Sequence, residues 1–103
     1  MLSTDVDVAT ITLTADKNYD GIEALVCCTQ DTYWKVVQED DGTPAILADM
    51  ITGAGQYSFE AIFKNIEFTA GSSGTQELKI IGNQLGHGKA SDLYATLTTY
   101  QVD

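Results

Sequence analysis

A two-residue alternation of apolar and polar side chains is the feature that most constrains how this chain can fold. The alternation runs over residues 6–14 and 32–39 and is clearest over residues 56–63. Successive side chains of a β-strand point to opposite faces, so this period predicts strands that bury one face. Thirteen of the 103 residues are threonines, and β-branched residues favour strands. The sequence therefore predicts an all-β protein.

Clusters of turn-forming residues separate the alternating segments. The strongest lies at residues 40–44, where Asp41-Gly42 supplies the positive φ angles of a tight hairpin that pairs residues 33–39 with residues 45–50. About eight strands at this spacing are typical of an antiparallel β-sandwich, jelly-roll or immunoglobulin-like, with little helix. Further turn clusters lie at residues 16–21, 52–55, 71–74 and 82–91. The expected strands are residues 6–14, 23–29, 32–39, 45–50, 56–63, 66–68, 77–81 and 93–102.

Two segments depart from simple alternation. Residues 23–29 form a short apolar run, which predicts a strand buried on both faces. Residues 44–51 combine helix-compatible side chains with a proline at a first-turn position, so one short helical turn is an alternative there. A chain of this length has room for one core, and no linker divides it. We expect one domain over residues 1–103, with an extended N-terminal arm over residues 1–7.

The alternation also assigns side chains to faces. Trp34 is expected in the core, because small sandwiches often bury one central aromatic residue, whereas Tyr33 points the other way. The predicted core consists of Ile11, Leu13, Leu25, Trp34, Val36, Phe59, Phe63, Leu78, Ile80, Leu93 and Leu97.

The two cysteines, Cys27 and Cys28, are adjacent in the sequence. Their Cα atoms lie only about 3.8 Å apart, so a disulfide between them would be strained. Neighbouring side chains of a strand point to opposite faces, so we expect one buried and one half-exposed free thiol. Free thiols, together with a start at residues 1–7 that has neither a basic nor an apolar leader segment, predict synthesis in a reducing cytoplasm without a signal peptide.

The charge balance excludes some functions. Fifteen Asp and Glu residues against five lysines give a net charge of −10, which argues against binding to nucleic acid or anionic lipid. The carboxylates cluster at Asp5/Asp7, at Asp16/Asp20 and at residues 39–41, but no complete calcium-loop motif is present. The turn at Gly42 already explains residues 40 and 41. We therefore expect no bound metal and no cofactor.

No catalytic motif is present in the sequence. His87 lies between two glycines and has neither an acidic residue nor a nucleophile at a suitable spacing, so we expect no enzyme activity. A zinc site would need two ligands besides the cysteines, and His87 is the one histidine. Tyr33 and Tyr57 could form an aromatic platform for a ligand such as a sugar.

Strongly alternating strands imply exposed sheet edges, which invite pairing with another chain. In this respect the chain resembles the small accessory virion proteins of tailed bacteriophages, in the start at residues 1–7, the strand-turn-strand at residues 33–45, the segment at residues 55–60 and the Gly/Ser loop at residues 71–74. The resemblance is one of style across the whole chain and carries over no functional residues. It implies a structural role in a capsid, as a decoration or cement protein, or in a tail, with self-association, a trimer being favoured, and a place in the virion.

The expected contact segments are residues 2–8, 82–91 and 94–102, because chain ends and glycine-rich loops order most easily on assembly. The candidate interface residues are Leu2, Val6, Val8, His87, Tyr94 and Tyr100. Two other functions stay open. One is a carbohydrate- or receptor-binding module that uses Tyr33 and Tyr57, and the other is an acidic inhibitor that mimics nucleic acid.

Overall fold

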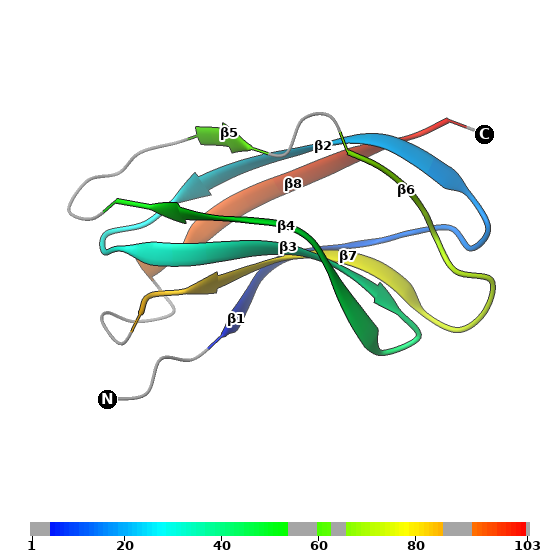
Figure 1. Cartoon of the computed structure of the whole chain (residues 1–103), viewed down its shortest axis with the longest axis horizontal. Helices are drawn as coiled ribbons and strands as arrows, with labels where there is room; N and C mark the ends of the chain where they lie inside the picture. The colour runs from blue at the N-terminus through cyan, green and yellow to red at the C-terminus, as the bar shows by residue number, and fades with distance from the viewer. Residues whose placement is uncertain (1–4, 54–59, 63–65, 86–91, 103) are drawn as a thin grey trace.

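The computed structural model describes residues 5–53, 60–62, 66–85 and 92–102. Within them, eight strands form two antiparallel sheets that lie against each other (Figure 1), which confirms the predicted all-β antiparallel sandwich. The strands are β1 (Val6–Thr12), β2 (Asn18–Cys27), β3 (Thr32–Asp40), β4 (Thr43–Thr52), β5 (Glu60–Ile62), β6 (Glu67–Thr69), β7 (Gln76–Asn83) and β8 (Tyr94–Gln101). No helix in these residues is long and apolar enough to cross a membrane.

The first sheet has the strand order β1-β7-β3-β4. In the second sheet β2 is central: β8 pairs along one edge, while β6 and β5 follow each other along the other edge. The pairings of β2 with β6, and of β7 with β3, are those of an immunoglobulin-like sandwich. The first and last strands have exchanged places relative to that order, because β1 lies beside β7 and β8 lies beside β2.

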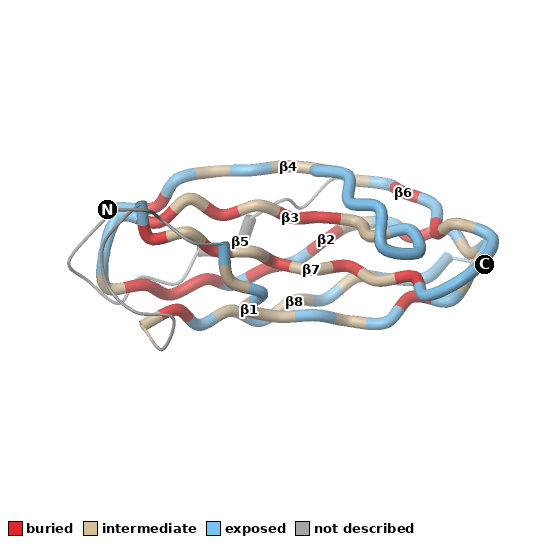
Figure 2. Tube along the Cα trace, turned by 90° about the horizontal axis from the view of Figure 1, so that it is seen from below, coloured by how far each residue is buried: buried red, intermediate tan, exposed pale blue. Residues whose placement is uncertain are grey.

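The core lies between the sheets and centres on Trp34, which is fully buried. Figure 2 shows how buried positions alternate with more exposed ones along β2, β3 and β7. Ile11 and Leu97 are partly buried against this core, and Phe59 and Phe63 lie outside the described residues. The predicted core residues that are buried are Leu13, Trp34, Val36, Leu78, Ile80 and Leu93.

The strand β2 corrects two predictions. It begins at Asn18, so most of the segment predicted as a turn is strand, and the turn itself centres on Asp16, with a φ of 64°. Ile22 and Ala24 point inward and are fully buried, whereas Leu25 points outward and is 41% exposed. Burial of both faces, with Leu25 in the core, was a wrong prediction, because the described residues form no third layer outside the second sheet.

The hairpin predicted at Asp41-Gly42 is confirmed. Both residues have positive φ angles, 48° and 87°, and they join β3 to β4 in antiparallel pairing that starts from Asp40 and Thr43. The alternative of a helical turn at residues 44–51 is wrong, since this segment is part of the strand β4. Pro44 is tolerated there because β4 is an edge strand and needs hydrogen bonds along one side only.

Buried polar side chains tie the strands together at both ends of the sandwich. At one end, Trp34 Nε1 donates a hydrogen bond of 2.9 Å to Thr52 Oγ1, and Cys28 Sγ lies 3.1 Å from the same oxygen. At the other end, the buried amide of Gln76 donates to Asp40 Oδ1 at 2.6 Å and accepts from the Gly71 N–H at 2.7 Å. These contacts satisfy groups that would be costly to bury alone.

Gly82 lies opposite Trp34 on the neighbouring strand, and the indole ring packs over its backbone. A Cβ atom at this position would lie 3.0 Å from Trp34 Cζ3 and 3.0 Å from Leu93 Cδ1. We expect Gly82→Ala to lower the free energy of unfolding by about 1–3 kcal/mol, because neither neighbour can move without repacking the core. Urea denaturation measures this change.

The matched control is Gly53→Ala, because a Cβ atom there meets nothing within 4 Å. It should change the free energy of unfolding by less than about 1 kcal/mol. Equal effects of the two substitutions would contradict the packing of Trp34 on Gly82.

Candidate functional site

The predicted site residues fall into three groups. Leu2, Tyr57 and His87 lie outside the described residues. Val6 and Val8 are half-buried on β1, where they pack against the core instead of standing free on the surface. The remaining three, Tyr33, Tyr94 and Tyr100, lie on the two outer faces of the sandwich, and the structure does not bring them into one site.

The outward side of β8 carries an exposed, uncharged row of side chains. Tyr94 is 57% exposed and Tyr100 is 53% exposed, and the threonines between them, Thr96 and Thr98, are exposed as well. We call these four residues the β8 strip. Both tyrosines were predicted as interface residues from their place in the C-terminal segment, whereas the two threonines were missed because small polar residues give no distinct signal.

The neighbouring positions of β2 frame the β8 strip on one side. Leu25 pairs with Thr96 and adds an exposed apolar side chain next to it. Glu23 lies opposite Thr98, and its carboxylate accepts a hydrogen bond of 3.5 Å from the Tyr100 hydroxyl. The strip is therefore bordered by an apolar side chain towards one end and by carboxylates towards the other.

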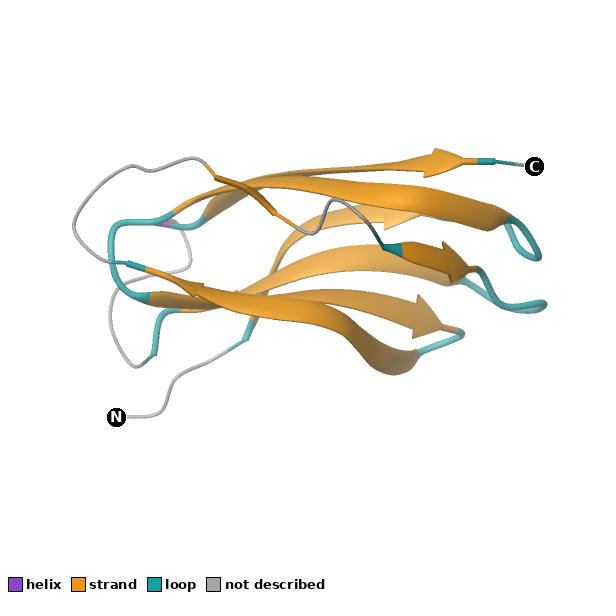
Figure 3. Ribbon diagram, turned by 45° about the horizontal axis from the view of Figure 1, so that its top comes forward, coloured by secondary structure: helices purple, strands orange, loops and turns teal. Residues whose placement is uncertain are grey.

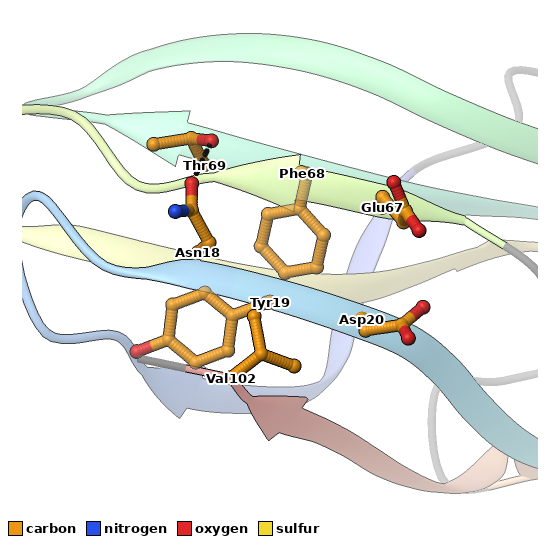
Figure 4. Close-up of a pocket in the computed structure, with 7 residues that line it drawn as sticks. All are labelled: Asn18, Tyr19, Asp20, Glu67, Phe68, Thr69 and Val102. Carbon is orange, nitrogen blue, oxygen red and sulfur yellow. Dashed lines mark hydrogen bonds between the residues drawn. The ribbon is translucent and has the colours of Figure 1, made fainter.

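A pocket of about 470 Å³ lies where β2, β6 and the residue after β8 meet (Figure 4). Two stacked aromatic rings, of Tyr19 and Phe68, lie side by side in it with centroids 5.2 Å apart. Thr69 Oγ1 donates a hydrogen bond of 2.6 Å to Asn18 Oδ1 at the rim. The lining residues are Asn18, Tyr19, Asp20, Glu67, Phe68, Thr69 and Val102.

Two carboxylates lie next to each other in this pocket. Asp20 and Glu67 are paired residues of β2 and β6, both are exposed, and neither carboxylate has a hydrogen bond or ion pair with another described side chain. Carboxylates accept hydrogen bonds from hydroxyl and ammonium groups. The described lining contains no histidine, cysteine or lysine, and its ionisable groups are these two carboxylates and the Tyr19 hydroxyl.

The outer face of the first sheet carries a network of ion pairs. Lys35 Nζ lies 2.9 Å from Asp5 Oδ2, and Lys79 Nζ lies 3.1 Å from Asp7 Oδ2 and 2.7 Å from Glu39 Oε2. The hydrogen bonds that Lys79 donates to Glu39 and Asp7 raise the pKa of its ammonium group, the bond to Glu39 contributing most. The Asp5/Asp7 cluster therefore anchors the start of β1 to β3 and β7.

The hydrogen bonds that Asp5 accepts lower the pKa of its carboxyl group below the ordinary 3.8, the bond from Lys35 contributing most and the bond from Asn83 next. Among the described residues, no three His, Cys, Asp or Glu side chains are placed to hold a metal ion. The Asp5/Asp7 cluster instead has lysine partners in the chain itself.

Tyr33 is half-buried on the same face, and its hydroxyl donates a hydrogen bond of 2.5 Å to Asp49 Oδ2. This bond to a carboxylate raises the pKa of Tyr33 above its ordinary 10.0. Ile51, which pairs with Tyr33, is 63% exposed. A platform of Tyr33 with Tyr57 cannot be placed, since Tyr57 is outside the described residues.

Both cysteines are free, and both are buried. The prediction of one half-exposed thiol is wrong because of Cys27: Cys28 continues the inward series of Ala24 and Val26, whereas Cys27, on the opposite face at the end of β2, is buried as well. The side chain of Cys28 packs in the core and contacts Thr52.

The chain matches no protein-family model, no curated protein and no solved structure. Within the described residues, the two most distinctive surfaces are the β8 strip and the pocket beside Asp20.

The contact between Asp5 and Lys35 predicts an acid-sensitive anchor for β1. Because the pKa of Asp5 is lowered in the folded protein, its contribution to stability is present above the ordinary value of 3.8 and is lost as the pH falls through the folded value. An NMR titration of the side-chain carboxyl should give a pKa below 3.8, and Lys35→Met should raise it.

The pair is solvent-exposed, so its contribution should be only about 0.2–1 kcal/mol. Asp5→Asn should destabilise the protein at about pH 6, and this destabilisation should diminish as the pH falls below 3.8 and the carboxyl group becomes protonated. An Asp5 pKa that is unchanged by Lys35→Met would contradict the role of this lysine.

Proposed function

We propose that the protein is a non-enzymatic structural protein that assembles with itself and with a larger protein shell through the β8 strip and the adjoining sheet edge. The observation that carries the proposal is the exposure of Tyr94 and Tyr100 beside two exposed threonines on an edge strand that contains no charged residue. Exposed aromatic side chains at uncharged positions are typical of protein interfaces.

The charge of the molecule supports a specific contact surface. At a net charge of −10, copies of the chain repel one another, so association needs a region where little charge is brought together. Exposed carboxylates occur on both outer faces, for example Asp7 on the first sheet and Glu67 on the second, and neither lies on β8. This scatter gives the acidic-inhibitor alternative no concentrated acidic face among the described residues.

The resemblance to phage virion proteins makes a capsid or tail the partner we propose for this surface. Virion components are held for long periods, and such association depends on apolar contact and strand pairing more than on surface charge. We propose the virion as the location of the protein on the same grounds.

The test is the mass of the protein in solution at two salt concentrations. Light scattering should give a multiple of 11.1 kDa, and the oligomer should persist at about 0.5 M salt, because salt screens the repulsion between acidic chains without weakening apolar contacts. Binding to isolated virion shells should persist in the same salt. A protein that is monomeric at every concentration and binds no virion component would contradict the proposal.

One observation favours a second candidate, a carbohydrate-binding module. Tyr100 is exposed and pairs with Asp20, which lines the pocket, so an aromatic ring lies near carboxylate and amide groups that could bind sugar hydroxyls. This site differs from the platform of Tyr33 and Tyr57 that the sequence suggested.

If the module is correct, the protein binds on a glycan array and Tyr100→Ala reduces that binding at least about tenfold, the loss expected for one buried stacking contact. Tyr94→Ala is the matched control, since it lies six positions away on the same strip, roughly 20 Å along the strand. Equal losses from both substitutions would place the sugar elsewhere.

A further inference from the structure

The edges of the two sheets differ in how well they are protected against pairing. The pairing of β1 is interrupted between Asp7 and Ala9, and β4 contains Pro44, Asp49 and an irregularity in its pairing with β3. Within the described residues, the strands β5 and β6 have three residues each. Short strands, bulges, prolines and charged residues are the devices that prevent edge-to-edge association.

The strand β8 has none of these devices. It is eight residues long and contains neither proline nor a charged residue. Its pairing with β2 has one irregularity, between Asp20 and Ile22, but the extra residue there is Gly21 of β2, so every residue of β8 has a partner. Among the described strands it pairs with β2 alone. The strand β1 belongs to the other of the two layers of strands seen in Figure 3; it comes close to β8 but does not pair with it. Half of the backbone groups along an edge strand point away from its neighbour.

The β8 strip is symmetric along its length. Its outward residues are Tyr94, Thr96, Thr98 and Tyr100, arranged symmetrically about Leu97. If two copies of β8 pair antiparallel with Leu97 at the centre, Tyr94 lies opposite Tyr100 of the second copy, and Thr96 lies opposite its Thr98. Aromatic–aromatic and Thr–Thr pairs are favourable across antiparallel strands, and a shift by two residues would replace these matches with mixed pairs.

Because β8 pairs with no described strand other than β2 and its strip is symmetric, we infer that β8 pairs with β8 of a second copy of the chain about a two-fold axis at Leu97, which joins two β2–β8 sheets into one. The inference rests on the proposed function and names the partner at the same surface. A two-fold contact must be self-complementary, and the symmetric strip meets that condition.

The distribution of charge also favours a second copy of the chain as the partner of β8. The chain carries −10, yet this contact places no carboxylate or lysine from either β8 against the other. Glu23 and Asp20 belong to β2, one strand further from the axis. A two-fold contact gives a dimer, so the trimer implied by the phage resemblance would be compatible with it only in a larger assembly such as a hexamer.

The test compares two double variants by sedimentation across a concentration series. T96K/T98K places lysine opposite lysine twice in the paired strands, and T96E/T98K places glutamate opposite lysine twice. Both variants put the same lysine at position 98, beside Glu23. The two lysines of T96K/T98K change the net charge from −10 to −8, and the glutamate and lysine of T96E/T98K leave it at −10, so overall repulsion is no greater in the first variant.

We expect T96K/T98K to raise the dimer dissociation constant at least about tenfold, because like charges directly opposite each other destabilise paired strands. We expect T96E/T98K to keep the dimer, since each new charge then meets an opposite one. Circular dichroism and thermal unfolding check that both variants fold.

A second measurement needs no substitution: hydrogen exchange of the amides of residues 95–100 in the natural sequence should slow as the protein concentration rises. An oligomer that survives T96K/T98K, that is weakened equally by both variants, or that leaves the exchange of β8 unchanged would overturn this contact while leaving assembly intact. A monomer at every concentration would overturn both the contact and self-assembly.

Discussion

The packing of the Trp34 ring on the bare backbone of Gly82 is the contact on which the rest of the sandwich depends. Trp34 is the largest fully buried side chain, and its position on β3 lets it cover β7 while its Nε1 atom bonds to Thr52 at the end of β4. Thr52 in turn contacts Cys28, which follows β2 in the other sheet. The Trp34 side chain thus holds β3, β4 and β7 together and, through Thr52 and Cys28, connects them to the second sheet. This packing is possible because residue 82 has no side chain to occupy the space.

The arrangement of the terminal strands determines which surfaces remain for binding. Because β1 lies beside β7, it is held on the first sheet by the ion pairs of Asp5 and Asp7, and its pairing is irregular. Because β8 lies beside β2, the second sheet ends in a regular, uncharged strand. The same exchange brings the residue after β8 next to the pocket formed by β2 and β6, so both candidate surfaces follow from one feature of the topology.

Short sequence patterns correctly predicted the strands and turns that depend on neighbouring residues alone. The alternation around Trp34 and the Asp41-Gly42 turn were sufficient for β3, β4 and their hairpin. Such patterns do not determine which strands pair over long distances in the sequence. An apolar run is the same whether one or both faces of its strand are covered by other residues, so Leu25 was assigned to the core. The pocket was missed for a related reason. Residues 18–20 have the composition of a turn, and only their pairing with β6 and β8 makes them part of a strand. Tyr94 and Tyr100 were predicted as interface residues because they lie in the C-terminal segment, and in the structure the alternation of β8 places both on the exposed face.

The exchange of the terminal strands also has a consequence for how the protein is made. Tyr19 pairs with Gln101, and Val6 pairs with Gly82, so in each sheet a terminal strand pairs with residues that lie far away in the chain. Contacts of this kind form slowly, because a long loop of chain must be ordered before they contribute any stability. During synthesis one edge of β2 has no partner strand until β8 has been translated. In that interval the nascent chain exposes an unpaired strand edge, which is the kind of surface that chaperones bind.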